Sequence, residues 1–313
     1  YKIHDTASFD PEEETLEKLV APQAGPRKYK HVFVSHISRY GFVTFCGLLN
    51  CFADCLAYYL TMIGVTAGAH RLWAHKTYKA KIPLQIFLML CHSMSYQHSL
   101  FMWVRDHRLH HKYSDTDADP HNASRGFFYS HVGWTVVNRH PELVKRAKLL
   151  DLSDMLKNTV VMFQKRNIKW MNPVFTLVIP TLIPMYFWHE TFSVAYHVNV
   201  LRFILSLNSV FMVNSFAHMF GTKPYDKGIE ATQNFLVILL TLGEGFHNYH
   251  HTFPYDYRTG ELGSMLNFST SFIDLCAWLG LAYDRRSVSP GVIEKRIIRS
   301  GDGRQDKYGM VLG

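Results

Sequence analysis

The stretch GFVTFCGLLNCFADCLAYYLTMIGVTAG, residues 41–68, is an apolar run of 28 residues with one charged side chain, Asp54. Together with the apolar residues from Val32 onward the run is about 37 residues long, whereas a membrane-spanning helix needs about 20. The run therefore predicts either one overlong helix or two shorter helices. We favour a transmembrane hairpin over residues 31–69, with a tight turn near Asn50 to Asp54.

A second apolar block lies in the middle of the chain. It runs from Pro173 to Trp188, is interrupted by HETFS at residues 189–193, and resumes from Val194 to Ala217 with Arg202 as its charged residue. Prolines within a span are tolerated where neighbouring groups satisfy the freed carbonyls. Residues 171–217 therefore predict a second transmembrane hairpin.

A shorter apolar segment, IPLQIFLMLCHSMSY, occupies residues 82–96 and is preceded by Lys79 and Lys81. It is short for a membrane span. We interpret it as an interfacial or buried helix, with a fifth span as the competing interpretation.

Lysine and arginine are concentrated outside the two apolar blocks. By the positive-inside rule, we expect the N-terminal segment 1–30, the region 70–170 and the C-terminal region 218–313 to be cytosolic. The predicted fold class is an all-α integral membrane protein, with four transmembrane helices in two hairpins and a helical cytosolic cap. The five cysteines show no paired spacing, which is typical of a reducing compartment.

The formal net charge of +8 does not indicate a nucleic-acid partner. No recognition motif accompanies the basic residues, and the topological asymmetry accounts for them. A basic cytosolic face would instead suit anionic ligands, the lipid bilayer and an acidic partner protein.

Histidine is concentrated in a repeated pattern. The segments DHRLHHKYSDTDADPH and GEGFHNYHH both contain His-x-x-His-His, at His107, His110 and His111 and at His247, His250 and His251. With 19 histidines in 313 residues, chance produces such a pattern roughly 0.07 times per chain. Residues at i, i+3 and i+4 share one helix face, so each cluster can direct three imidazoles at one point. Imidazole clusters of this kind favour a transition metal.

A third pair, His70 and His75, lies in GVTAGAHRLWAH, residues 64–75. Five residues turn an ideal helix by about 500°, which leaves the two rings about 140° apart. The two rings can then meet at one metal only if the helix contains a bulge, if its end is frayed, or if the two side chains approach a shared site from different sides. Because a structural zinc site takes four ligands, eight histidines in three boxes predict a site for two metals, on the cytosolic side.

The isolated histidines are expected to be structural, and these are His4, His31, His36, His92, His121, His131, His140, His189 and His197. The segment SDTDADP, residues 114–120, predicts a solvated turn that could also brace the neighbouring histidine helix.

Two kinds of chemistry fit an imidazole-rich metal pair. Zinc hydrolysis needs a water position and a nearby acid as base, for which Glu244 or Asp106 are candidates. Oxygen activation needs open iron positions, an external supply of electrons and exclusion of water. The membrane setting favours oxygen chemistry.

Five segments together resemble the acyl-CoA delta-9 desaturases, the stearoyl-CoA desaturase family, over roughly residues 30–303. They are GVTAGAHRLWAHKTYKA, WVRDHRLHHKYSDTDADPHN, RGFFYSHVGW, NSFAHMFGTKPYD and GEGFHNYHHTFPYDYR. This resemblance implies four transmembrane helices with a cytosolic cap, in the endoplasmic reticulum membrane. It also implies a di-iron centre that uses O2 and electrons from cytochrome b5 and its NADH-dependent reductase to desaturate a fatty acyl-CoA.

By position in the motifs, the resemblance implies nine metal ligands: His70, His75, His107, His110, His111, His218, His247, His250 and His251. It further implies that Asn214 holds a metal-bound water, and one helical turn would place Asn214 on the same face as His218. An all-histidine site should also accept zinc, which could replace iron in a recombinant sample.

The resemblance implies substrate contacts as well. Arg105 and Asp106 match residues at the CoA end, and Trp103 matches a tunnel-wall position. The sequence departs from the family at three further candidate substrate-binding positions, His98, Arg139 and Phe211.

Tyr58 and Met62 lie one turn apart where the family closes its acyl tunnel. Two bulky side chains there predict a preference for palmitoyl over stearoyl substrates, by steric exclusion. Two alternative functions remain: a membrane hydroxylase with the same kind of histidine boxes, and a non-catalytic metal carrier, which would need more polar residues along its spans.

Overall fold

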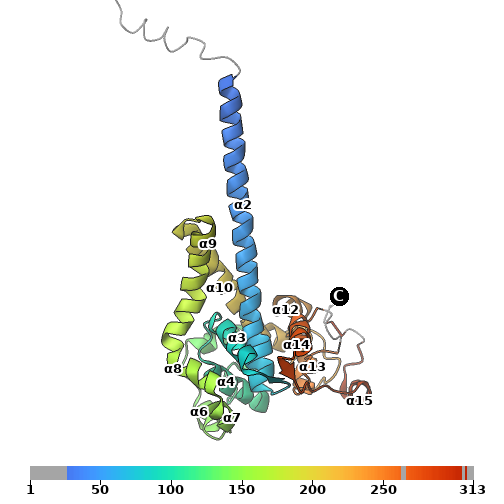
Figure 1. Cartoon of the computed structure of the whole chain (residues 1–313). Coiled ribbons are helices and arrows are strands. Elements are labelled where there is room, and N and C mark those ends of the chain that lie inside the picture. Colours follow the sequence, from blue (N-terminus) through green and yellow to red (C-terminus); the bar gives the residue numbers. More distant parts are fainter. Residues whose placement is uncertain (1–26, 262–265, 305–306, 309–313) are drawn as a thin grey trace, which may run out of the picture. The chain divides into compact units, whose positions relative to one another are not determined.

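The computed structural model describes residues 27–261, 266–304 and 307–308, and it is mostly helical (Figure 1). Residues 50–313 form one compact unit, in which all contacts given below lie. The helices are α2 (Arg27–Ile63), η1 (Gly64–Ala74), α3 (Ile82–Ser93), α4 (Leu100–Tyr113), η2 (Ala123–Arg125), α5 (Phe127–His131), η3 (Gly133–Thr135), α6 (Pro141–Ala147), α7 (Ser153–Lys157), α8 (Thr159–Pro173), η4 (Val174–Val178), α9 (Ile179–Trp188), α10 (Phe192–Asn214), α11 (Phe216–Met219), α12 (Phe235–Leu240), α13 (His247–Thr252), α14 (Phe268–Trp278) and α15 (Pro290–Ser300).

The described residues also contain one small sheet, which the all-helical prediction omits. Strands β1 (Lys79–Ala80) and β2 (Ala282–Tyr283) pair antiparallel, with Lys79 opposite Tyr283. Most of the predicted N-terminal segment 1–30 lies outside the described residues.

The described part of the chain contains three helical runs that are long and apolar enough to cross a membrane: Thr44–Ala74, Thr159–Trp188 and Phe192–Met219. The predicted turn near Asn50 to Asp54 is wrong, because α2 continues through it as one helix. The side chain of Asn50 explains why no turn is needed. Its amide donates to Glu190 Oε2 at 2.6 Å and its carbonyl oxygen accepts from Trp188 Nε1 at 2.9 Å, so its polar groups are satisfied across the bundle.

The second apolar block forms two helical runs joined by a short turn. The first run comprises α8, η4 and α9, and α10 follows after residues 189–191. His189 ends α9 in the left-handed region, at φ 57°. Pro173 directly precedes η4, a π-helical segment in which the backbone accommodates the missing donor.

A buried arginine joins all three runs. Arg202 of α10 is 4% exposed, and its guanidinium donates to the Thr176 carbonyl of η4 at 2.9 Å and to Thr61 Oγ1 of α2 at 3.2 Å. It also donates to Asn199 Oδ1, one turn away, at 2.6 Å. A cation is costly inside a span unless it is hydrogen-bonded, and these neutral acceptors satisfy it.

The segment predicted as an interfacial or buried helix is α3, which is shorter than a span. It packs against η1 through Leu84, Leu88 and Cys91, all buried. Gly64 makes this approach possible, because a Cβ there would lie 2.2 Å from the backbone nitrogen of His92.

We predict that Gly64→Ala destabilises the protein by about 3 kcal/mol or prevents folding, because backbone atoms of α3 cannot yield to the added Cβ. Thermal unfolding in detergent measures this. Gly291→Ala on α15 is the matched control, since its Cβ meets nothing within 4 Å, and it should be neutral or slightly stabilising. Equal melting temperatures for the two variants would contradict the close approach of η1 and α3.

Candidate metal centre

The nine predicted histidine ligands come from four parts of the fold. His70 and His75 lie in η1 and at its C-terminal cap, and His218 lies in α11. The remaining six, His107, His110, His111, His247, His250 and His251, lie in α4 and α13. In both of these helices the i, i+3, i+4 spacing places three imidazoles on one face.

The pair in η1 converges because η1 is a π-helix. Its hydrogen bonds join residues i and i+5, and the bond between His75 N and His70 O, at 3.0 Å, is one of them. The structure therefore contains the bulged form among the three possibilities open from the sequence.

The structure gathers all nine histidines into two groups, within each of which one ring nitrogen of every member lies within 4.8 Å of the others. The first group contains His70, His75, His107, His111 and His250. The second group contains His110, His218, His247 and His251. Each group thus combines histidines that are far apart in the sequence, and α4 and α13 contribute histidines to both groups.

The Nε2 atoms within each group lie close together. In the first group His75 Nε2 is 2.8 Å from His107 Nε2, and in the second His218 Nε2 is 3.0 Å from His247 Nε2. Two nitrogens bound to one transition metal at about 2.1 Å, with a right angle between them, would be about 3.0 Å apart. The spacing and the donor type therefore fit a metal ion in each group.

The protonation of six of the nine histidines also fits metal binding; for His110, burial lowers the pKa but Asp119 raises it further, above its ordinary value. Burial, followed by the charges of neighbouring groups, holds the pKa well below its ordinary value for His75, His107, His111, His247, His250 and His251. These imidazoles are neutral at pH 7, as metal ligands must be.

Three carboxylates orient the histidines from outside the groups. Glu244 lies 2.7 Å from His70 Nδ1, Asp119 2.9 Å from His110 Nδ1, and Asp115 3.1 Å from His218 Nδ1. An ionised carboxylate only accepts hydrogen bonds, so each of these Nδ1 atoms carries the proton and each Nε2 lone pair faces its group. The sequence predicts that the turn with Asp115 and Asp119 could brace the histidine helix, but it does not predict the contact between Glu244 and His70.

The Asp-rich turn is solvated in part, as predicted, with Thr116 and Asp117 exposed. Asp119 is buried, and it also accepts from the backbone nitrogens of Asp115 and His121. His121 lies beside the same carboxylate, 3.5 Å from Asp119 Oδ1. The turn therefore braces the histidine helix, and His121 belongs to this outer layer.

Glu244 is held by a buried arginine as well as by His70. Arg71 is fully buried, and its Nη2 donates to Glu244 Oε1 at 2.7 Å. Burial would raise the pKa of Glu244, but Arg71 and His70 lower it to about 2. Glu244 is thus a fixed anion that orients His70, and it is not poised as the base of a hydrolase.

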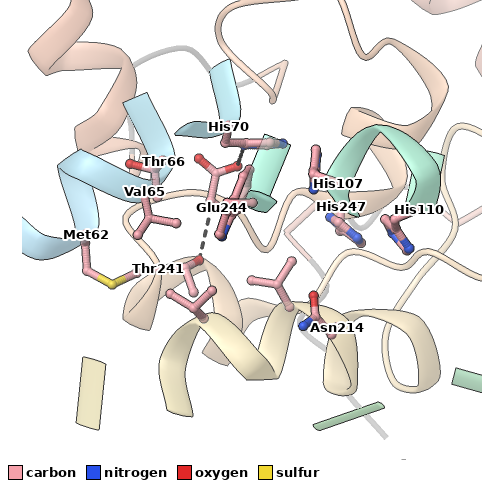
Figure 2. A pocket seen from close by; sticks show the side chains of 13 residues that line it. Met62, Val65, Thr66, His70, His107, His110, Asn214, Thr241, Glu244 and His247 are labelled. Carbon is pink, nitrogen blue, oxygen red and sulfur yellow. Dashed lines mark hydrogen bonds and ion pairs between the residues drawn. The ribbon is translucent and has the colours of Figure 1, made fainter. Parts of the chain in front are cut away.

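A narrow pocket opens beside both groups (Figure 2). It has a cavity volume of about 40 Å³, with Met62 and Val65 among its apolar lining and His70, His107, His110 and His247 contributing from the metal groups. Trp103 lines it too, with its ring stacked on His107 at 4.9 Å.

A wider pocket of about 310 Å³ shares Trp103, His107, Val210 and Asn214 with the narrow one. Three other predicted substrate residues, His98, Asp106 and Phe211, line this outer pocket. Together the two pockets lead from a partly polar chamber, past the histidines, to Met62.

The other predicted substrate residues lie outside these linings. Arg105 and Arg139 both bind Asp106, at 2.6 and 2.7 Å, so this carboxylate in the lining of the outer pocket is paired with two cations. Tyr58 directs its hydroxyl to Ser209 Oγ at 2.8 Å and lines neither pocket.

Asn214 lines both pockets and lies near His110 and His247 (Figure 2). It does not share a helix with His218 as expected, because α10 ends at Asn214 and α11 begins at Phe216. His218 reaches the second group through this break.

Comparison with known proteins adds independent findings. The fatty acid desaturase family model matches residues 48–262. An acyl-CoA Delta(11) desaturase of Choristoneura rosaceana is 51% identical, covering 96% of this chain and 94% of the relative. Stearoyl-CoA desaturase 5 of Bos taurus is 53% identical over 78% of this chain and 73% of its own, and an acyl-CoA Delta-9 desaturase of Acheta domesticus is 49% identical over 81% and 71%. The chain belongs to the fatty acid desaturase family.

Proposed function

We propose that this protein is an O2-dependent desaturase of long-chain fatty acyl-CoA with a two-metal centre. The observation that carries the proposal is that histidines from both groups line one narrow, largely apolar pocket. In the reaction two C–H bonds of the acyl chain break and a C=C bond forms. The two hydrogens removed from the chain, together with two protons and two electrons from an external donor, reduce O2 to two water molecules.

The nine histidines would hold two iron ions, five ligands in the first group and four in the second. When bound, iron would supply the oxygen activation that an unactivated alkyl chain requires. Zinc fits the same imidazole donors but has no redox chemistry, so a zinc-filled sample would be inactive.

The remaining residues of the site orient the substrate and control water. The apolar wall formed by Met62, Val65 and Val213 would hold the acyl chain and exclude water. Asn214, in both pockets, would hold a water beside the second group. Trp103, stacked on His107, would form the wall at the point where the chain passes the metals.

The outer pocket suits the polar end of the substrate. Asp106 lines it as a carboxylate held by Arg105 and Arg139, and His98 lies in the same lining. We propose that this arginine-bound carboxylate orients the CoA end through hydrogen bonds.

The double-bond position is the finer part of the proposal. We retain the delta-9 position expected from the sequence motifs, and the Delta(11) relative makes delta-11 the competing outcome. Because both kinds of relative are about half identical to this chain, the residues common to both cannot decide between them.

We further propose that cytochrome b5 and its NADH-dependent reductase supply the electrons at the endoplasmic reticulum membrane. The excess of lysine and arginine near the histidine boxes supports a cytosolic site. The five cysteines show no paired spacing in the sequence, which supports a reducing environment.

The direct test is the mass of the acyl product formed by iron-loaded protein with cytochrome b5, its reductase, NADH and palmitoyl- or stearoyl-CoA. We expect a loss of two mass units, and fragmentation of the product then locates the double bond. A gain of sixteen would indicate a hydroxylase. An unchanged acyl chain, with iron occupancy confirmed, would favour a metal carrier.

We predict that Met62→Ala raises activity on stearoyl-CoA relative to palmitoyl-CoA. Met62 is fully buried and lines the narrow pocket, so its removal makes room for two more methylenes. Burial of about 0.8 kcal/mol for each of the two methylenes corresponds to an increase of up to about fifteenfold. The product ratio from an equal mixture of both substrates measures this.

Met171→Ala is the matched control, because Met171 is equally buried but lines neither pocket. It should lower stability and leave the product ratio unchanged. If Met62→Ala left the ratio of stearoyl to palmitoyl products unchanged, Met62 would not be the residue that closes the acyl pocket.

A further inference from the structure

The outward face of α14 carries large apolar side chains. Their exposed fractions are 55% for Phe268, 53% for Leu275, 81% for Trp278 and 55% for Leu279. Phe272 lies on the same face at helical spacing, and the opposite face, including Ile273 and Cys276, is buried. Phe268, Leu275 and Leu279 are thus as exposed as Leu205, which lies on the candidate span of α10 and is 54% exposed.

One end of α14 packs on a membrane-spanning run. The ring of Phe268 lies 6.3 Å from the ring of Tyr59, which is within the candidate span Thr44–Ala74. Ser269, the next residue, is hydrogen-bonded to Thr66 of η1 at 2.7 Å. The N-terminal end of α14 is therefore level with residues inside that run.

The other end of α14 lies among cations and interfacial aromatics. The backbone nitrogen of Lys81 donates to Leu281 O at 2.9 Å, two residues after the face ends. Lys79 pairs with Tyr283 in the small sheet, and Arg285 follows. Tryptophan, tyrosine and basic residues are typical of the headgroup level of a bilayer.

The apolar face continues onto α3. Phe87 stacks against Phe272 with ring centroids 6.0 Å apart, and Ile82 and Ile86 of α3 are also exposed. The charged residue of α14, Asp274, is paired with Arg285 and accepts from the Tyr257 hydroxyl, so it places no free charge on this face.

We propose that α14 is embedded in the bilayer leaflet nearest the metal centre, with Phe268 deepest and Leu279 at the headgroups. The occupant of the face is lipid, because the face is continuous with a candidate span at one end and meets a basic, aromatic rim at the other. This revises the expectation that residues 218–313 are wholly cytosolic, and it does not depend on the reaction catalysed.

Spin-label accessibility in lipid nanodiscs tests the proposal. Single cysteines at Phe268, Leu275 and Leu279 are introduced after alanine replaces the exposed Cys51 and Cys55. Each site is labelled with a nitroxide, and collision with oxygen, which concentrates in lipid, is compared with collision with a water-soluble nickel complex. Leu205→Cys is the reference for lipid, and Glu294→Cys on α15 is the reference for water.

We expect oxygen to dominate at all three sites, with depth decreasing in the order Phe268, Leu275, Leu279. Nickel-dominated collisions at the level of Glu294→Cys would overturn the proposal. Dipolar broadening between labels would also overturn it, because a second copy of the chain would then cover the face. The readout is structural, so an inactive enzyme leaves the test intact.

Discussion

The close approach of nine buried or half-buried imidazoles is the constraint on which the rest of the site depends. Nitrogen atoms about 3 Å apart within each group cannot all point lone pairs at one another in a buried volume without a cation between them. The surrounding structure holds them there nonetheless. The π-helix of η1 aligns His70 with His75, and the Asp-rich turn fixes His110 and His218.

The same principle applies within the apolar runs, where polar side chains bind one another instead of water. Arg202 joins α2, η4 and α10 through neutral acceptors, and Asn50 is bound by Glu190 and Trp188. Thr61, one of the acceptors of Arg202, is adjacent to Met62 at the end of the narrow pocket. The polar contacts between helices thus also fix the wall of the narrow pocket, the proposed acyl site.

The structure gathers the nine histidines that the sequence motifs single out, and six of them follow a readable spacing. His-x-x-His-His marks one helix face, and the motif resemblance added His218, which no spacing rule would find. The π-helix, Glu244 and Asp119 were not predictable in the same way. A bulge is a tertiary compromise. The carboxylates lie beside their histidines, Asp119 at His110 and Glu244 at His70 of η1, only once the segments that carry them have folded.

The first apolar block was misread for a related reason. Its length allowed a hairpin, and Asn50 and Asp54 looked like turn residues, but a polar side chain in a span can instead be satisfied by a neighbouring helix. The family was therefore readable from local motifs, whereas the number of spans and the double-bond position depend on contacts between distant segments.

The metal content of the purified protein, after loading with ferrous iron and removal of free metal, tests the central claim most directly. Two iron atoms per chain by mass spectrometry are expected. His197→Ala, in which an exposed histidine outside both groups is removed, should also retain two. One iron atom per chain, or none, would contradict a centre built from two histidine groups.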